Sequence, residues 1–134
     1  MTGNNLQQRD EILQIHSKMK ILIIEDEQLI REGLQQVLEL KGYEVHIAPD
    51  GNEGCKLLEK EKPDIVITDI ILPEKDGIEV MFEIKQKLPK AKIIAISGGG
   101  RISAKDHLQV ARELGAHAIL TKPFSTDFLI NEIN

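Results

Sequence analysis

The alternation of short apolar runs with segments of helical period constrains this chain most. Five such runs occur from Lys20 onward, at residues 21–24, 45–48, 65–68, 93–97 and 118–120. Between the first two, apolar side chains recur every three or four positions, and Gly42 follows where a helix would end. The same spacing returns before Pro89 and before Gly115. Five βα units in succession predict an α/β fold, a parallel sheet flanked by five helices.

The runs differ in a way that predicts the order of the strands. Residues 21–24, 65–68 and 93–96 are apolar throughout, as strands buried on both faces must be. The run that begins near Glu44 alternates in polarity, and residues 118–120 are short, which is typical of edge strands. The pattern favours a doubly wound sheet in the order 2-1-3-4-5. Ligands of such sheets bind beyond the carboxyl ends of the strands, here between the first and third.

Composition limits the classes of protein to consider. With 134 residues and 41% apolar content, one globular domain is expected over residues 19–134. No run is long enough to span a membrane, and the first 18 residues lack the pattern of a secretion signal, so a cytoplasmic protein is expected. A net charge of -5 argues against direct contact with nucleic acid. Cys55 is expected to be structural, and the four histidines to lie on the surface.

Residues 1–18 stand apart as an N-terminal extension. Ile12, Ile15 and Met19 have the spacing of a weak amphipathic helix, while the polar composition is equally compatible with disorder. Met19 is also a plausible start. The segment is therefore either a native extension or an addition made in cloning.

Polar residues gather at the predicted carboxyl ends of the strands. Glu25 and Asp26 follow the first strand, Asp69 ends the third, Ser97 ends the fourth and Lys122 ends the fifth. Carboxylates that converge in one crevice repel one another, and a hard divalent cation such as Mg²⁺ relieves that repulsion. An aspartate can then act as nucleophile toward a phosphoryl group whose charge is held by metal, ammonium and hydroxyl. The pattern predicts a Mg²⁺ site that supports phosphoryl transfer.

These motifs, taken together, resemble the response-regulator receiver family of two-component signalling, which has a CheY-like, flavodoxin-like fold. The resemblance covers residues 19–134 and rests on four dispersed motifs, KILIIEDE, DIVITDIILPEKDG, IIAISG and TKPF. It implies that Asp69 is the phosphoacceptor and that Ser97 and Lys122 contact the phosphoryl group. It also implies Mg²⁺ ligation by Glu25, Asp26, Asp69 and the backbone carbonyl of Ile71.

The resemblance further implies partners and a mode of action. A histidine kinase or a histidine phosphotransfer protein would supply the phosphoryl group, and a downstream effector protein would read the result. The domain would be a signalling switch that catalyses its own phosphorylation and dephosphorylation, rather than an enzyme acting on a separate substrate. The responsive face would comprise the helix predicted before Gly115, the strand at residues 118–120 and the helix that follows that strand. In the family the peptide bond before the proline of TKPF is usually cis, so a cis Lys122-Pro123 bond is expected.

The sequence departs from the family pattern at two positions. Ile119 stands where the family commonly has Tyr or Phe, so the aromatic half of the usual switch is missing. The acidic pair is Glu25-Asp26 rather than two aspartates, a variation expected to leave metal binding intact. Three glycines after Ser97 also predict a mobile loop.

Several alternatives stay open. Glu27 is expected to be solvated, and Asp76 to belong to a turn. A haloacid-dehalogenase type of phosphatase also uses an aspartate nucleophile with Mg²⁺, but it has a second aspartate two residues later, where this chain has Ile71. A degenerate receiver that docks a partner without phosphorylation is the other alternative.

Overall fold

The computed structural model describes residues 19–70, 77–98, 109 and 111–134. The expectations for residues 1–18, for Ile71 and Asp76, and for the loop after Gly98 lie outside the described residues. Among the residues that are described, no helix combines the length and the apolar character needed to cross a membrane.

Five parallel strands form a single sheet in the order β2-β1-β3-β4-β5, as the sequence predicts. The ends of each strand lie within two residues of the ends of its apolar run, because the run stops where the chain reaches the solvent. The strands are β1 (Lys20–Ile24), β2 (Glu44–Ala48), β3 (Ile65–Asp69), β4 (Lys92–Gly98) and β5 (Ala118–Lys122).

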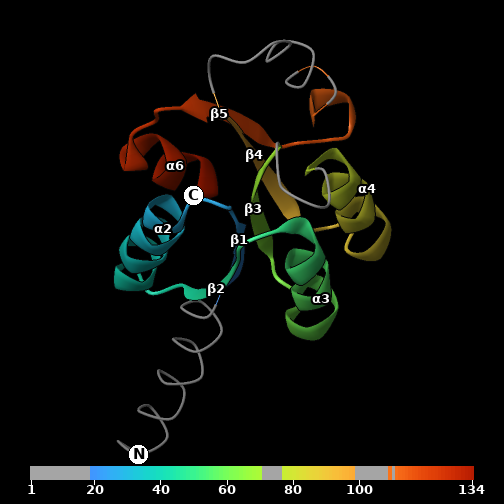
Figure 1. Cartoon of the computed structure of the whole chain (residues 1–134), viewed down its shortest axis with the longest axis horizontal. Helices are drawn as coiled ribbons and strands as arrows, with labels where there is room; N and C mark the ends of the chain where they lie inside the picture. The colour runs from blue at the N-terminus through green and yellow to red at the C-terminus, as the bar shows by residue number, and fades with distance from the viewer. Residues whose placement is uncertain (1–18, 71–76, 99–108, 110) are drawn as a thin grey trace, which may run out of the picture.

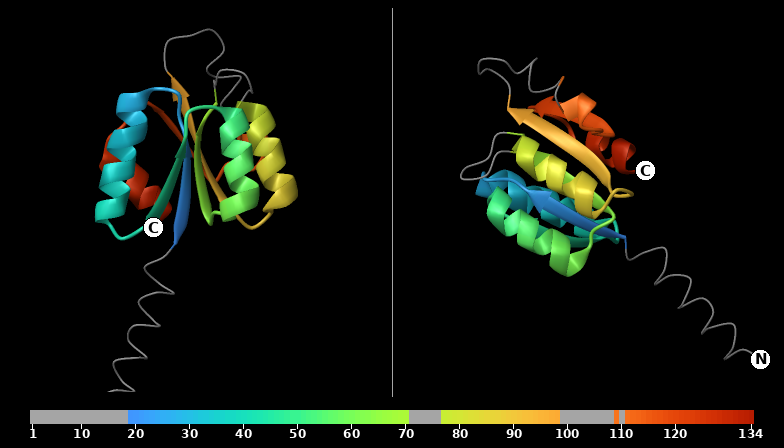
Figure 2. Two further views of the ribbon diagram at one scale, coloured as in Figure 1. Left: turned by 60° about the horizontal axis from the view of Figure 1, so that its bottom comes forward. Right: turned by 90° about the vertical axis from the view of Figure 1, so that its right-hand side faces the viewer.

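Helices cover both faces of the sheet (Figures 1 and 2). Helices α2 (Gln28–Leu40) and α6 (Thr126–Ile133) lie on one face, and α3 (Gly51–Glu61) and α4 (Gly77–Lys87) lie on the other. Residues 109 and 111–113 are also helical. The expected five-helix, doubly wound α/β architecture is confirmed.

Local signals in the sequence explain where the helices begin and end. Asp50 accepts a hydrogen bond from the backbone N–H of Glu53 at 2.9 Å and so caps the start of α3. Ser125 caps α6 in the same way. Gly42 ends α2 with a φ of 97°, a left-handed conformation that glycine adopts without strain.

The two faces of the sheet bury separate halves of the core. Successive side chains of a strand point to opposite faces, so Leu22 packs toward α3 and α4 whereas Ile23 packs toward α2 and α6. Strands β1, β3 and β4 are buried along almost their whole length, and β2 and β5 are half-buried edges, as predicted. Cys55 is half-buried against the cluster that includes α3 and α4, which agrees with a structural residue.

Gly77, the first residue of α4, lies close to the backbone at the end of the site-bearing strand β3. A Cβ at this position would overlap the backbone carbonyl oxygens of Asp69 and Ile70, and backbone cannot yield as a flexible side chain can. Gly77→Ala is therefore expected to lower the free energy of unfolding by about 1–3 kcal/mol. Urea unfolding followed by far-ultraviolet circular dichroism measures it, since the chain has no tryptophan.

Gly33→Ala is the matched control for this prediction. Gly33 lies inside α2, and a Cβ there would meet nothing within 4 Å. Alanine should stabilise that helix by about 0.5–1 kcal/mol. Equal stabilities of the Gly77→Ala variant and the native protein would contradict the close-approach argument.

Candidate functional site

Three carboxylates meet at the carboxyl ends of the two central strands. Glu25 and Asp26 directly follow β1, and Asp69 is the last residue of β3. One carboxylate oxygen from each lies within 4.8 Å of the others. The adjacent parallel strands bring these side chains together as the sequence predicts.

The loop after β1 is held in place by backbone contacts. The N–H of Glu25 donates to the carbonyl of Ala48 at 3.0 Å, and the guanidinium of Arg31 donates to the carbonyl oxygens of Glu25 at 2.8 Å and Asp26 at 3.4 Å. Arg31 reaches back from the first turn of α2 to do so. Sequence analysis did not single out Arg31, because nothing in its spacing shows that its side chain folds back over the loop.

Lys122 links the acids from the far side of β4. Its Nζ lies 2.7 Å from Glu25 Oε1, 2.9 Å from Asp69 Oδ2 and 3.0 Å from Glu27 Oε1. The Lys122 side chain is 14% exposed, so its ammonium points inward rather than to bulk water. The Lys122-Pro123 peptide bond is cis, as expected.

Burial and charge shift the pKa values of Glu25 and Lys122. Glu25 is 0% exposed, and its desolvation raises its pKa to about 7 against the opposing effect of the Lys122 ammonium and the Glu27 N–H. Burial lowers the pKa of Lys122, but hydrogen bonds to Glu25, Asp69 and Glu27 outweigh that effect and raise it above its usual range. The ammonium therefore stays charged, while one of its carboxylate partners is poised to take up a proton near neutrality.

Ser97 supplies a buried hydroxyl at the same end of the sheet. It lies near the end of β4 and is 1% exposed. Its Oγ has no hydrogen-bond partner within the part of the chain that the structure describes. A buried hydroxyl left without a partner costs about 1–3 kcal/mol. Such an atom is suited to bind an oxygen that arrives with a ligand.

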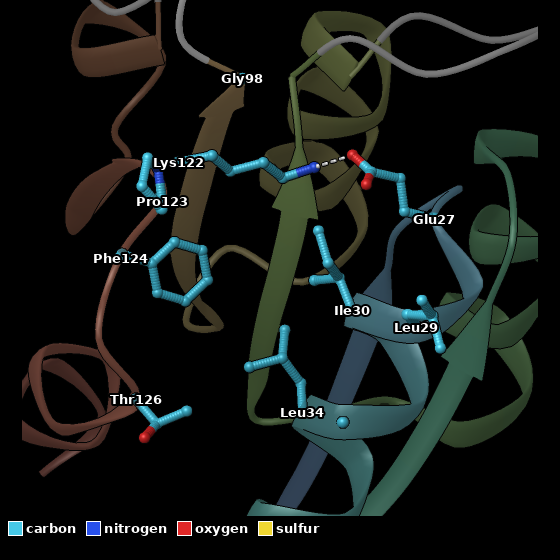
Figure 3. Close-up of a pocket in the computed structure, with 10 residues that line it drawn as sticks. Glu27, Leu29, Ile30, Leu34, Gly98, Lys122, Pro123, Phe124 and Thr126 are labelled. Atoms are coloured by element: carbon cyan, nitrogen blue, oxygen red, sulfur yellow. Dashed lines mark hydrogen bonds and ion pairs between the residues drawn. The ribbon is translucent and has the colours of Figure 1, made fainter.

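Glu27 takes part in the site in a way that the sequence analysis missed. Its side chain is 59% exposed, in line with the expected solvated acid, yet it forms an ion pair with Lys122 (Figure 3). Glu27 is also the N-cap residue of α2, but its side chain makes no capping hydrogen bond. Its position directly after the Glu25-Asp26 pair was the feature of the sequence that could have predicted this role.

A groove of about 640 Å³ opens beside this ion pair. Ile30 and Leu34 of α2 line one side, and Phe124 and Thr126 line the other (Figure 3). Leu29 lies at its rim and is 88% exposed. An apolar surface thus borders the charged cluster.

Comparison with known proteins gives the family. The sequence model described as "Response regulator receiver domain" matches residues 21–134. The chain belongs to this family, and a receiver domain is a signalling switch of two-component systems.

Solved structures of receiver domains agree with this assignment. A CheY-like receiver domain protein from Methanospirillum hungatei is 31% identical with a TM-score of 0.79, and the match covers 85% of this chain and 89% of that one. A receiver domain from Clostridium thermocellum is 33% identical with a TM-score of 0.79, over 86% and 90%. NtrX from Brucella abortus is 31% identical with a TM-score of 0.75, over 84% of this chain but 25% of that one.

The raised pKa of Glu25 predicts a pH-dependent stability when divalent cations are removed. Because the folded-state value of about 7 lies above the ordinary value of 4.5, the contribution of Glu25 to stability is complete below about pH 4.5 and is lost as pH rises through 7. Glu25→Gln is uncharged at every pH. Between pH 4.5 and 7, its free energy of unfolding should therefore rise by roughly 2–3 kcal/mol relative to that of the native protein.

Urea unfolding in EDTA at a series of pH values measures this difference. Glu53→Gln, which removes an exposed carboxylate from α3, is the control and should follow the native protein at every pH. Parallel curves for Glu25→Gln and the native protein would show that Glu25 does not titrate as its burial implies.

Proposed function

We propose that this domain accepts a phosphoryl group from phosphohistidine onto the carboxylate of Asp69. The observation that carries the proposal is the position of Lys122, whose ammonium contacts both Asp69 and Glu25 from inside the crevice. A buried carboxylate in contact with a fixed cation suits formation of an aspartyl phosphate, and so does a buried Ser97 hydroxyl at the same end of the sheet that has no hydrogen-bond partner among the described residues.

The donor set fits Mg²⁺. Three carboxylates supply oxygen ligands close enough together to share one ion, and one of them, Asp26, is exposed and open to water. We propose Glu25, Asp26 and Asp69 as ligands, with the Ile71 carbonyl as the fourth ligand that the family resemblance implies. When bound, Mg²⁺ neutralises negative charge on the carboxylates and on the transferring phosphoryl oxygens.

The protein side chains divide the remaining work. An oxygen of Asp69 forms the new O–P bond as the P–N bond of the phosphohistidine breaks, and the electron pair of that bond returns to the imidazole. Lys122 moves its ammonium from the carboxylates to a phosphoryl oxygen, and the Ser97 hydroxyl donates a hydrogen bond to another. Lys122 and Ser97 thereby hold the charge that transfer delivers.

Phosphorylation would act as a switch because it puts a phosphoryl group of roughly -1.5 to -2 charges in a buried place, where the Asp69 carboxylate carried one. The face expected to respond comprises the helical residues before β5, then β5 and α6. Moving a two-state equilibrium from 1% to 99% active takes about 5.5 kcal/mol. Ile119 is half-buried against the core in place of the usual aromatic residue, so we propose that the shift does not depend on an aromatic side chain turning inward.

The groove beside Lys122 offers the phosphodonor a place to bind. Leu29, Ile30 and Phe124 provide apolar contacts adjacent to the charged cluster, so a histidine kinase or phosphotransfer protein could dock there with its phosphohistidine toward Asp69. We place this receiver unit at residues 19–134 and in the cytoplasm. We also propose a protein effector downstream and no direct contact with nucleic acid.

Two rival functions remain distinguishable. A docking module that is never phosphorylated would use the same apolar groove, but it has no need of an inward-facing Lys122. A phosphatase of the haloacid-dehalogenase type would need an acid two residues after Asp69, where the sequence has Ile71.

Intact-mass measurement after incubation with acetyl phosphate and Mg²⁺ tests the proposed function. One added phosphoryl group is expected, and Asp69→Asn should abolish it because an amide oxygen is not a nucleophile of comparable strength. Omission of Mg²⁺ should suppress the addition as well. If the native protein gains no mass under conditions that label a known receiver, the docking alternative replaces this proposal.

Glu27 is expected to restrain the reaction, because it competes with the incoming phosphoryl oxygens for Lys122. Exposed ion pairs are worth up to about 1 kcal/mol, so Glu27→Gln should raise the rate of phosphorylation by acetyl phosphate about two- to fivefold at low ionic strength. Salt should reduce the gain by screening.

Glu53→Gln makes the same change of net charge on α3, where Glu53 pairs with Lys56. This control separates a local effect at Lys122 from a general one. Equal rates for the two variants would mean that Glu27 does not hold Lys122 back.

A further inference from the structure

A second cluster with metal-binding chemistry lies at the opposite end of the sheet from Asp69. Glu44 and His46 are two residues apart on the edge strand β2, so they point to the same face. Glu61 is the last residue of α3, which packs against that face (Figure 2). One ligand atom from each of the three lies within 4.8 Å of the others.

The imidazole of His46 lies between the two carboxylates. Its Nε2 is 2.8 Å from Glu44 Oε2 and 3.3 Å from Glu61 Oε1. Ligands of a tetrahedral Zn²⁺, at bond lengths near 2.0–2.2 Å, lie roughly 3.3 Å apart. The three atoms therefore have the spacing of ligands around one small ion, so binding an ion between them requires little movement of the side chains.

His46 was expected to lie on the surface, and its side chain is 26% exposed. It is also held by two acids, because residues of β2 and α3 that lie far apart in sequence meet at this edge. The three residues do not form a local metal-binding motif, so the sequence alone does not predict this cluster.

Lys20 lies beside the cluster, but its ammonium does not occupy the place between the three ligand atoms that an ion would take. It is paired with Glu44 in the β1–β2 register, and its Nζ is 3.8 Å from Glu44 Oε2 and 3.6 Å from Glu61 Oε1. That ammonium donates instead to the backbone carbonyl of Glu61 at 3.2 Å.

We propose that Glu44, His46 and Glu61 form a binding site for a divalent transition-metal ion of the Zn²⁺ type. One imidazole nitrogen with two carboxylate oxygens is a ligand set that suits Zn²⁺, whereas Mg²⁺ and Ca²⁺ take oxygen ligands alone. Water would complete the coordination, since the cluster is half-buried. The ion ties the edge strand β2 to the end of α3 and stabilises the folded state.

Titration of the full chain with ZnCl₂ in excess MgCl₂, by calorimetry and by ¹⁵N spectra of the histidine imidazoles, tests this site. Excess Mg²⁺ competes with Zn²⁺ for the oxygen cluster at Asp69, and a loss of Zn²⁺ affinity in variants of the second cluster assigns the binding to that cluster. The His46 Nε2 resonance should shift on addition of Zn²⁺, and the temperature of unfolding should rise.

Three variants make the test specific. His46→Gln should weaken Zn²⁺ binding at least about tenfold, as loss of a ligand does. His117→Gln, which removes another histidine outside the cluster, should bind as the native protein does. Lys20→Met should bind more tightly, because it removes a cation that repels the metal.

Unchanged Zn²⁺ affinity in His46→Gln would overturn the proposal, and so would a Lys20→Met variant that binds no more tightly than the native protein. Glu61→Gln provides a second ligand variant should His46→Gln fail to fold, and circular dichroism identifies that case. None of these variants touches Asp69, so labelling by acetyl phosphate should persist in all of them.

Discussion

The contact between the Lys122 ammonium and the carboxylates of Glu25 and Asp69 is the interaction on which the site depends. Two buried acids from neighbouring strands would repel each other strongly in a medium of low dielectric constant. The ammonium lies within 3 Å of both and lowers that repulsion without removing it. Burial of Glu25 explains its raised pKa, and the remaining excess of negative charge makes the crevice suitable for a divalent cation.

The parallel direction of the strands makes this contact possible. Parallel strands end at one edge, so the residues at the ends of β1 and β3 are adjacent, and Lys122 of β5 reaches them across β4. Helix α2 then serves the site in two ways. Arg31 holds the backbone of the acidic loop, and Glu27 extends the ion-pair network to the surface.

The two ends of the sheet present different chemistry for a structural reason. At the carboxyl end, loops bring acids together with a lysine and a hydroxyl, and oxygen ligands dominate. At the amino end, an edge strand places Glu44 and His46 against the end of α3, and nitrogen joins the ligand set. A hard ion would suit the first cluster and a borderline ion the second, because only the second has a nitrogen ligand.

The sequence by itself determined the layer architecture and the strand order, because burial imposes a periodic pattern of apolar residues on each helix and strand. It also determined the principal acids, because sheets of this kind bind ligands beyond the carboxyl ends of their strands. Asp69, Ser97 and Lys122 were predictable in that way. Only the tertiary structure decided that Glu27 pairs with Lys122 and that His46 lies between two carboxylates. Those contacts join residues from elements far apart in the chain, and their distances depend on packing that no local pattern encodes.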